Sequence, residues 1–349
     1  MSVLTVPAGG GLGIRQLSRV QLGTAVVAVV ALTLLLFAVT PLQGRVGFLL
    51  VAVALSLATV TALQWVVEGR RRAIDRMATM LAYAAFGLAL LPLGAVLSYT
   101  VARGLKRFRP DFLTHSMAGV GPLDKTGGVY HSMIGTLEQV LIATLISVPV
   151  GLLVAVYVTE YGRGKLTIAI RFFIDVMTGI PSIVAGLFVF AFWVLALRRG
   201  FSGVAAAIAL AILMLPVVVR SAEEMIRLVP NGLREASYAL GVPRWRTILS
   251  IVLPTAATGI TTGVMLAVAR VTGETAPLLL TSFGNDFIHT NPLQGQQSGL
   301  PLFVYQQAGS PFDVGVDRAW AGALTLILIV VVLYTAARLL TRRNTLVRR

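Results

Sequence analysis

Uncharged, mostly apolar stretches alternate with short charged segments along the whole chain. Eight of these stretches approach or exceed the ~20 residues that an α-helix needs to cross a hydrocarbon core of ~30 Å. They cover residues 22–44, 46–67, 77–102, 139–159, 176–197, 200–219, 247–269 and 319–337. The pattern therefore predicts an all-α integral membrane protein with about eight transmembrane helices.

The composition agrees with lipid as the solvent of this chain. Of its 349 residues, 56% are hydrophobic and 12% are charged, whereas soluble domains carry about 25% charged residues. Cysteine is absent and only 3 histidines occur, so a zinc or thiolate site has few candidate ligands. The net charge of +15 does not indicate nucleic-acid binding, because the basic residues flank apolar stretches and do not alternate with aromatic residues.

The basic residues favour a cytoplasmic N-terminus. With that orientation the inner segments exceed the outer ones in lysine and arginine by about two to one, and both termini are cytoplasmic. The predicted parts are a cytoplasmic tail (1–21), a transmembrane hairpin with a basic loop (22–76), a six-helix membrane domain (77–338) and a basic tail (339–349).

Some outer segments do not follow this simple picture. The clusters Arg103–Arg109 and Arg198–Arg199 place basic residues on the outer side, against the positive-inside rule. The outer loop at residues 281–317 is long and rich in glycine, proline, glutamine and asparagine. It is either a solvated connector or a contact surface.

The predicted cytoplasmic loop at residues 220–254 has the pattern of two short amphipathic helices. The first begins at Ser221, with Glu224 three residues later as in a capping box. The second begins near Asn231, a good N-cap residue, and ends before Gly241. Apolar residues share one face of this second helix, namely Leu233, Ala236, Ala239 and Leu240. A short, well-capped helix of this kind is suited to docking in a groove of a partner protein.

The second helix resembles the EAA loop of ABC-importer permeases. The matching positions are Glu235-Ala236-Ser237, Gly241, Ile251 and Leu253-Pro254, against the family pattern E-A-A, G and I-x-L-P. Ser237 replaces the second alanine of that pattern. The resemblance implies that this chain couples to a separate ATPase subunit through Glu235, Ala236, Ser237, Leu240 and Gly241.

A second match resembles phosphate importers of the PstA type. Residues 269–280 are similar to the segment A-R-x-x-G-E-T-A-P-L-L of that family. Further matches are Thr126-Gly127-Gly128-Val129, Val148–Gly151, Glu160-Tyr161-Gly162 and Gly179–Gly186. The resemblance begins at about Met77, so the N-terminal hairpin lies outside the common six-helix pattern.

The resemblance implies a bacterial plasma-membrane complex that carries inorganic phosphate. Its other members would be a homologous permease of the PstC type, ATPase subunits of the PstB type and an extracytoplasmic phosphate-binding protein of the PstS type. This sequence contains no P-loop motif. ATP with Mg²⁺ is therefore expected in the partner ATPase, and no cofactor is expected in this chain.

Arg270 and Glu274 are predicted to lie in one apolar helix at i, i+4 spacing, hence on one face. A charge at the centre of a bilayer costs about 2.5–3.5 kcal/mol on insertion scales, so both residues are expected to face protein or water. They form either a structural ion pair or part of a phosphate pathway, in which the guanidinium binds the anion through its planar donor fork. In the pathway interpretation Glu274 moderates the attraction, Thr275 adds a hydroxyl donor and Gly273 allows another helix to approach.

Three further residues are weaker candidates for function. Glu138 and Asp175 are expected to be structural, with Asp175 paired to Arg171 four residues before it. Pro181 predicts a kink or break in a helix, which suits either a gate or a tolerated membrane proline. Two alternative functions stay open: a permease for another oxyanion or small solute, and a membrane enzyme that uses the two intramembrane charges.

Overall fold

The structure is a computed structural model in which residues 19–39 and 45–346 are described. The chain divides into two compact units, residues 1–98 and 99–349. Within the described ranges, 6 helices are long and apolar enough to cross a membrane, and a bent pair makes a seventh candidate. The predicted number of about eight is approximate, because the apolar part of the first helix, Gly23–Ala38, is shorter than a full span. The predicted tail at residues 1–21 lies mostly outside the described residues.

The first unit consists of α1 (Arg19–Val39), α2 (Arg45–Glu68) and most of α3 (Arg70–Gly104). α1 and α2 pack together, with an edge-to-face contact between Phe37 and Phe48 at a centroid distance of 5.4 Å. The predicted basic loop after Glu68 is wrong, because only Gly69, in the left-handed region at φ +89°, separates α2 from α3. Arginine is a good helix former, so the basic residues extend α3.

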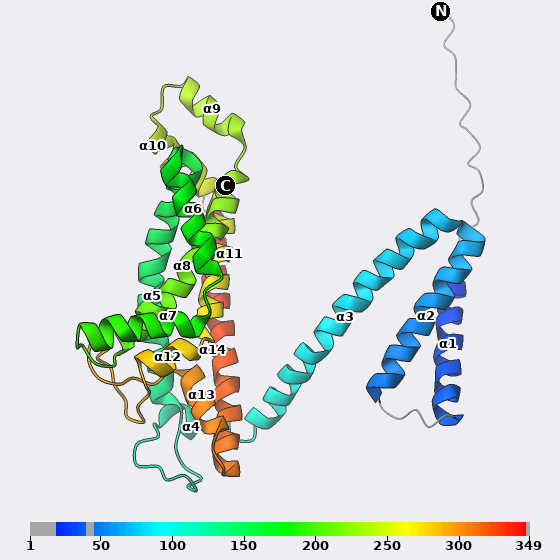
Figure 1. Cartoon of the computed structure of the whole chain (residues 1–349), viewed down its shortest axis with the longest axis horizontal. Coiled ribbons are helices and arrows are strands. Elements are labelled where there is room, and N and C mark those ends of the chain that lie inside the picture. Colours follow the sequence, from blue (N-terminus) through cyan, green and yellow to red (C-terminus); the bar gives the residue numbers. More distant parts are fainter. Residues whose placement is uncertain (1–18, 40–44, 347–349) are drawn as a thin grey trace, which may run out of the picture. The chain divides into compact units, whose positions relative to one another are not determined.

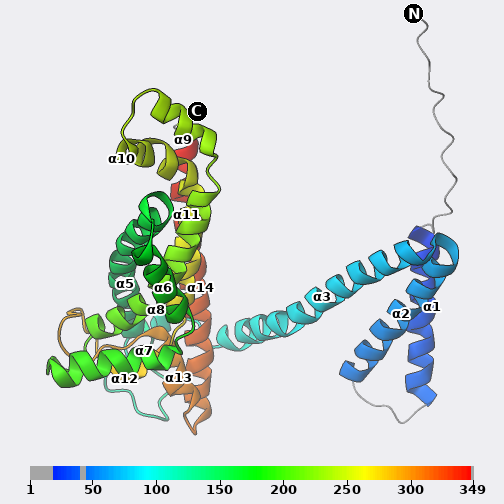
Figure 2. The ribbon, with the colours of Figure 1, turned by 45° about the horizontal axis from the view of Figure 1, so that its top comes forward.

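The second unit is a helical bundle (Figures 1 and 2). After the end of α3, its elements are α4 (Pro110–Thr114), α5 (Tyr130–Val156), η1 (Tyr157–Tyr161), α6 (Lys165–Thr178), α7 (Ser182–Val189), η2 (Phe190–Ala196), α8 (Gly203–Arg227), α9 (Asn231–Ala239), α10 (Arg244–Thr247), η3 (Ile248–Val252), α11 (Leu253–Thr272), α12 (Ala276–Thr281), α13 (Leu300–Ala308) and α14 (Asp313–Leu346). α9 lies at one end of this bundle, and α4 and α13 lie at the other.

α8 is the central helix of the second unit and packs against α5 and α11. Its small residues Ala205, Ala206 and Ala209 are completely buried. On α5, a Cβ added at Gly151 would come within 2.7 Å of Val218 Cγ1 on α8. Lipid is as apolar as the helix surfaces, so membrane helices associate through such close packing of small residues.

The stretch predicted as one span at residues 176–197 is a broken helix. α6 and the α7–η2 segment meet at an angle of 105°. The break falls at Gly179, Ile180 and Pro181, since proline disfavours helical conformation at the preceding residue. The predicted break at Pro181 is confirmed.

The loop at residues 281–317, predicted to lie on the outer side, is more than a solvated connector. Gln297 is only 1% exposed, and its Nε2 donates hydrogen bonds to Glu138 Oε2 at 2.5 Å and to the carbonyl of His289 at 3.1 Å. Gln139 Nε2 donates to Gln297 Oε1 at 3.1 Å. These bonds fix the loop to the start of α5, which fits the structural role expected for Glu138.

Candidate functional site

The helix predicted to dock on a partner is α9, and its C-terminal end is sharply defined. Val242 N–H donates to the carbonyl of Ser237 at 3.2 Å, and Gly241 N–H donates to that of Tyr238 at 2.9 Å. This is a Schellman motif, which satisfies the last carbonyls of a helix. Gly241 has φ +76°, and a Cβ added to it would have no atom within 4 Å. Glycine is therefore needed for the left-handed turn and not for close packing.

α9 exposes an apolar face. Leu240 is 83% exposed and Leu233 is 43% exposed. Ala236 and the acidic Glu235 are exposed as well. Exposed apolar groups on a short rigid helix are typical of a surface that a partner protein covers.

Ser237 differs from the other residues predicted to couple to an ATPase. It is 3% exposed, and its hydroxyl lies 2.8 Å from Thr247 Oγ1 on α10. Ser237 is thus too buried to touch a partner, and it holds α9 against α10 from within. The serine in place of the family's alanine provides this hydrogen bond.

A buried ion pair anchors α9, and sequence reasoning missed it. Arg234 donates to Glu160 Oε1 through Nη2 at 2.7 Å and through Nε at 3.1 Å, and the two side chains are 14% and 5% exposed. Arg234 also donates to the carbonyls of Val229 at 2.6 Å and Ile226 at 3.0 Å. Asn231 makes no capping hydrogen bond, contrary to the prediction, and its Oδ1 accepts from Arg234 Nη1 at 3.3 Å.

Glu160 lies at the end of η1 and therefore joins α9 to the end of α5. Arg244 on α10 donates to the carbonyl of Glu160 and lies over the Tyr161 ring, 5.0 Å from its centroid. The one sequence signal for this ion pair was Glu160 itself, a glutamate directly after the apolar stretch 139–159. Its partner is 74 residues away in sequence, beyond the reach of any local spacing rule.

The predicted first amphipathic helix of the loop is wrong, because α8 continues without interruption to Arg227. Ser221 does not begin a helix. It packs against Gly263 on α11, where an added Cβ would collide with the serine side chain. The capping-box pattern at Ser221 and Glu224 therefore has no capping role, since the preceding apolar turns already supply the helical hydrogen bonds.

Two ion pairs connect α6 to the end of α8. Arg171 lies 3.2 Å from Glu223, which Arg227 also contacts. Asp175 pairs with Arg220, so the predicted pairing of Asp175 with Arg171 is wrong. Residues four apart on α6 share a face, but each of the two finds its opposite charge on α8.

The intramembrane charges do not lie on one helix. α11 ends at Thr272, Gly273 terminates it, and α12 begins at Ala276. Arg270 is exposed on the surface of the chain, and Glu274 is half-buried. Among the described residues neither side chain forms a salt bridge. The predicted i, i+4 geometry is therefore wrong.

The start of α12 is positioned by close packing against α7. A Cβ added at Gly186 would come within 2.6 Å of Pro277 Cα. Two segments that are distant in sequence, Gly179–Gly186 and residues 269–280, thus meet in the fold. Gly273 has no such contact, because a Cβ there would meet only the carbonyl oxygen of Arg270, at 3.7 Å. Its predicted role in helix approach is not seen within this chain.

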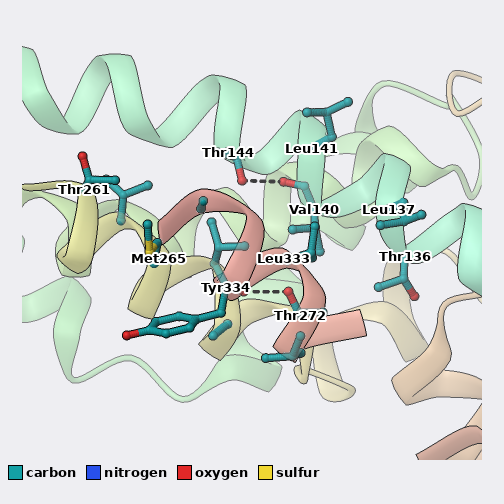
Figure 3. Close-up of a pocket in the computed structure, with 15 residues that line it drawn as sticks. Thr136, Leu137, Val140, Leu141, Thr144, Thr261, Met265, Thr272, Leu333 and Tyr334 are labelled. Atoms are coloured by element: carbon teal, nitrogen blue, oxygen red, sulfur yellow. Dashed lines mark hydrogen bonds between the residues drawn. The ribbon is translucent and has the colours of Figure 1, made fainter. Parts of the chain in front are cut away.

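A cavity of about 400 Å³ lies between α5, α11 and α14 (Figure 3). It has no charged lining residue. The hydroxyls of its four threonines each donate to a carbonyl four residues earlier in their own helix, so they offer no free donor to a ligand; they are Thr136, Thr144, Thr261 and Thr272. The cavity does not suit an anion. In the part of the chain that the structure describes, no group of three or more His, Cys, Asp or Glu residues is arranged to hold a metal.

Comparisons with known proteins agree with this architecture. The family described as "Binding-protein-dependent transport system inner membrane component" matches residues 147–346. The solved structure of a bacterial ABC transporter involved in the import of the acidic polysaccharide alginate is 15% identical, with a TM-score of 0.51 over 78% of this chain and 99% of that chain. At this identity the likeness concerns the fold alone.

Two curated relatives match most of the chain. The phosphate transport system permease protein PstA 1 of Mycobacterium tuberculosis (strain ATCC 25618 / H37Rv) is 46% identical over 282 residues, which cover 79% of this chain and 92% of the relative. The phosphate transport system permease protein PstA of Pasteurella multocida (strain Pm70) is 39% identical over 270 residues, 77% of this chain and 95% of the relative. The chain is therefore a multi-pass membrane protein that belongs to the binding-protein-dependent transport system inner membrane component family, in its PstA group.

Proposed function

We propose that this chain is the permease subunit of an ATP-driven importer of inorganic phosphate. The names of its PstA relatives support phosphate as the solute. In this proposal the chain forms half of the translocation pathway and pairs with a homologous permease. It hydrolyses no ATP itself, and ATP with Mg²⁺ is bound by partner ATPase subunits.

The observation that carries the coupling role is the exposed α9, whose C-terminal end is capped by a Schellman motif. The proposed contact with the ATPase consists of the apolar residues Leu233, Ala236 and Leu240 and the charged Glu235. Gly241 and Ser237 stabilise the helix and its packing without being part of that contact. A partner that moves α9 also moves the end of α5, because Arg234 and Glu160 form a buried pair and the arginine also donates to two backbone carbonyls. Movement of the ATPase would therefore be transmitted directly from α9 to the membrane helices.

The proposed substrate pathway passes Arg270. Its charge lies near the end of an apolar helix, on a face that is exposed in the isolated chain. A lipid-facing arginine is costly, so this face is better placed against the second permease, where the two subunits enclose the pathway. Guanidinium stays charged and matches phosphate oxygens with its planar donors. Glu274, close by but unpaired with Arg270, would weaken the attraction enough for release, and Thr275 would add a donor.

The orientation that supports this mechanism has α9 and both termini in the cytoplasm. α14 ends at the same end of the second unit as α9 (Figure 1). The binding protein then delivers phosphate at the opposite end. ATP binding closes the ATPase pair and opens the pathway outward, and hydrolysis returns it to the inward-open state.

The test is the initial rate of phosphate uptake into cells that express all subunits. Arg270→Ala is expected to assemble and to lose uptake by at least about tenfold, since hydrogen bonds to charged groups contribute about 1.5–3 kcal/mol. Glu235→Ala is expected to weaken co-purification of the ATPase or its coupled hydrolysis. Arg199→Ala and Glu224→Ala are the matched controls, because both residues are exposed and neither side chain has a partner among the described residues.

Each outcome separates one part of the proposal from another. Normal uptake by an assembled Arg270→Ala variant would remove that residue from the pathway. If the wild type carries sulfate or another solute and ignores phosphate, the substrate assignment fails although the permease assignment stands. Unchanged ATPase binding and hydrolysis in Glu235→Ala would contradict a contact at that residue.

A further inference from the structure

α4 lies at the end of the second unit opposite α9 (Figure 1). Residues of α4 and of its neighbouring segments line a pocket of about 500 Å³. Four basic residues line it: Lys106, Arg107, Arg109 and Lys125. Only two carboxylates line it as well, those of Asp111 and Asp317. Three of the four basic residues belong to the Arg103–Arg109 cluster. The positive-inside rule does not explain why this cluster is on the predicted outer side. We call this feature the outer basic pocket.

Arg107 is held in the wall of the pocket by backbone carbonyls. Its Nη2 donates to the carbonyl of Lys125 at 2.6 Å and to that of Thr126 at 2.7 Å. From the other side Arg318 donates to the carbonyl of Thr126 at 3.0 Å. The loop before α5 is thus fixed around two guanidinium groups. The buried Nε atom of each guanidinium has no hydrogen-bond partner.

The remaining cations of the pocket are free. Within the described part of the chain, the side chains of Lys106, Arg109 and Lys125 form neither a salt bridge nor a hydrogen bond. Burial lowers the pKa of the Arg107 guanidinium from its ordinary value, and Arg109 lowers it further, while Asp317 opposes the change. Burial is thus the main cost to the charge of Arg107, and an anion in the pocket would favour the charged form.

A glycine, Gly127, whose backbone N–H has no described acceptor, also lines the pocket. Its φ of +91° requires glycine, and an added Cβ would also come within 2.8 Å of Met117 Sδ. Phosphate oxygens are bound by this combination of guanidinium, ammonium and backbone N–H groups.

We propose that the outer basic pocket binds a phosphoryl anion, either free inorganic phosphate or the headgroup of an anionic phospholipid. Both sources present the same charged oxygens. The pocket follows directly after the apolar part of α3, where a span ends and headgroups lie. The site is separate from Arg270, and the proposal does not depend on whether the transported solute is phosphate.

The experiment uses the purified full chain in nanodiscs. In discs of phosphatidylcholine alone, binding of radiolabelled inorganic phosphate is measured. In discs of mixed lipid, retention of phosphatidylglycerol over phosphatidylcholine is measured by native mass spectrometry. The pocket variant is Arg109→Gln with Lys125→Gln, since Arg107 holds the loop and its replacement risks misfolding. The control with the same change in charge is Arg103→Gln with Arg199→Gln, two outer arginines that do not line the pocket. Arg270→Ala is added to each chain, so that phosphate bound at that residue does not contribute.

The pocket variant is expected to lose about tenfold or more in affinity for one of the two probes, since two charge-assisted contacts are removed. The control is expected to change less than about twofold, because neither of its arginines lines the pocket. Loss of phosphate binding identifies the free anion, and loss of phosphatidylglycerol retention identifies the headgroup. The proposal is overturned if the unmodified pocket binds neither probe saturably, or if pocket and control variants bind alike. If the double variant does not fold, Lys125→Gln alone is compared with Arg199→Gln.

Discussion

Two arginines of the second unit lie in opposite surroundings. Arg234 on α9 is 14% exposed and paired with Glu160, although it belongs to the end of the bundle where water is expected. Arg270 lies in the apolar helix α11, yet it is exposed on the surface of the chain and has no salt bridge among the described residues. The same type of side chain is thus paired with a carboxylate of this chain in one region and has no such partner in the other.

The difference indicates which charge supports the fold and which awaits another group. An arginine with a buried carboxylate and two backbone carbonyls has its hydrogen bonds supplied by its own chain. An arginine in an apolar helix without a partner is costly, and its compensation must come from a second subunit, water or an anion. Stability measurements can separate the two, because only the first arginine contributes to folding through its charge.

The largest effect is expected for Arg234→Ala. The variant leaves the carboxylate of Glu160 buried and uncompensated, which costs about 3 kcal/mol. A clear decrease in the thermal unfolding temperature of the full chain in nanodiscs would measure it. Arg227→Ala is the matched control, because that arginine is 55% exposed and Glu223 keeps Arg171. Equal stability of the two variants would contradict the anchoring role of Arg234.

A smaller effect is expected for Gly241→Ala. Any other residue at φ +76° is strained by about 1–2 kcal/mol, so the end of α9 would loosen and ATPase co-purification would decrease. Gly232→Ala in the same helix is the control, since nothing lies within 4 Å of its added Cβ and its φ is not positive. If both alanine variants bind the ATPase equally, the Schellman motif is not needed for docking.

Ser237→Ala is expected to cost about 1 kcal/mol, the net value of one hydrogen bond. The measurement is a double-mutant cycle with Thr247→Val, read by thermal unfolding. Removing both hydroxyls together is expected to cost less than the sum of the single changes, because neither group is then left unpaired. Strict additivity would mean that the 2.8 Å contact contributes nothing.

The smallest effect on stability is expected for Arg270→Gln, within about 0.5 kcal/mol of the wild type, as for substitutions that remove no internal contact. Phosphate uptake is nevertheless expected to decrease strongly. A loss of stability as large as that of Arg234→Ala would instead make Arg270 a structural residue. The contrast between the two arginines would then disappear.

Much of the architecture was predictable because apolar length is a local property. The spans, the break at Pro181 and the helix that ends before Gly241 all follow from residues within one or two turns. Predictions failed where a second element intervened. Ser221 has the pattern of a helix start, but the preceding apolar turns and the packing against Gly263 continue α8 through it. The basic residues after Gly69 are charged like a loop, yet their helix propensity extends α3.

The sequence alone determined that this chain spans a membrane, that α9 is a short helix ended by Gly241 and that a phosphate-importer segment surrounds Arg270. Charge is costly in lipid over each ~20-residue span, and helix ends need particular residues. Both features can therefore be predicted from residues close together in the sequence. Only the tertiary structure decided which charges are paired. Arg234 pairs with Glu160, 74 residues away in sequence. Asp175 pairs with Arg220 and not with Arg171. Arg270 pairs with no carboxylate of the described chain. Pairing depends on how helices pack, and spacing along one helix does not record that.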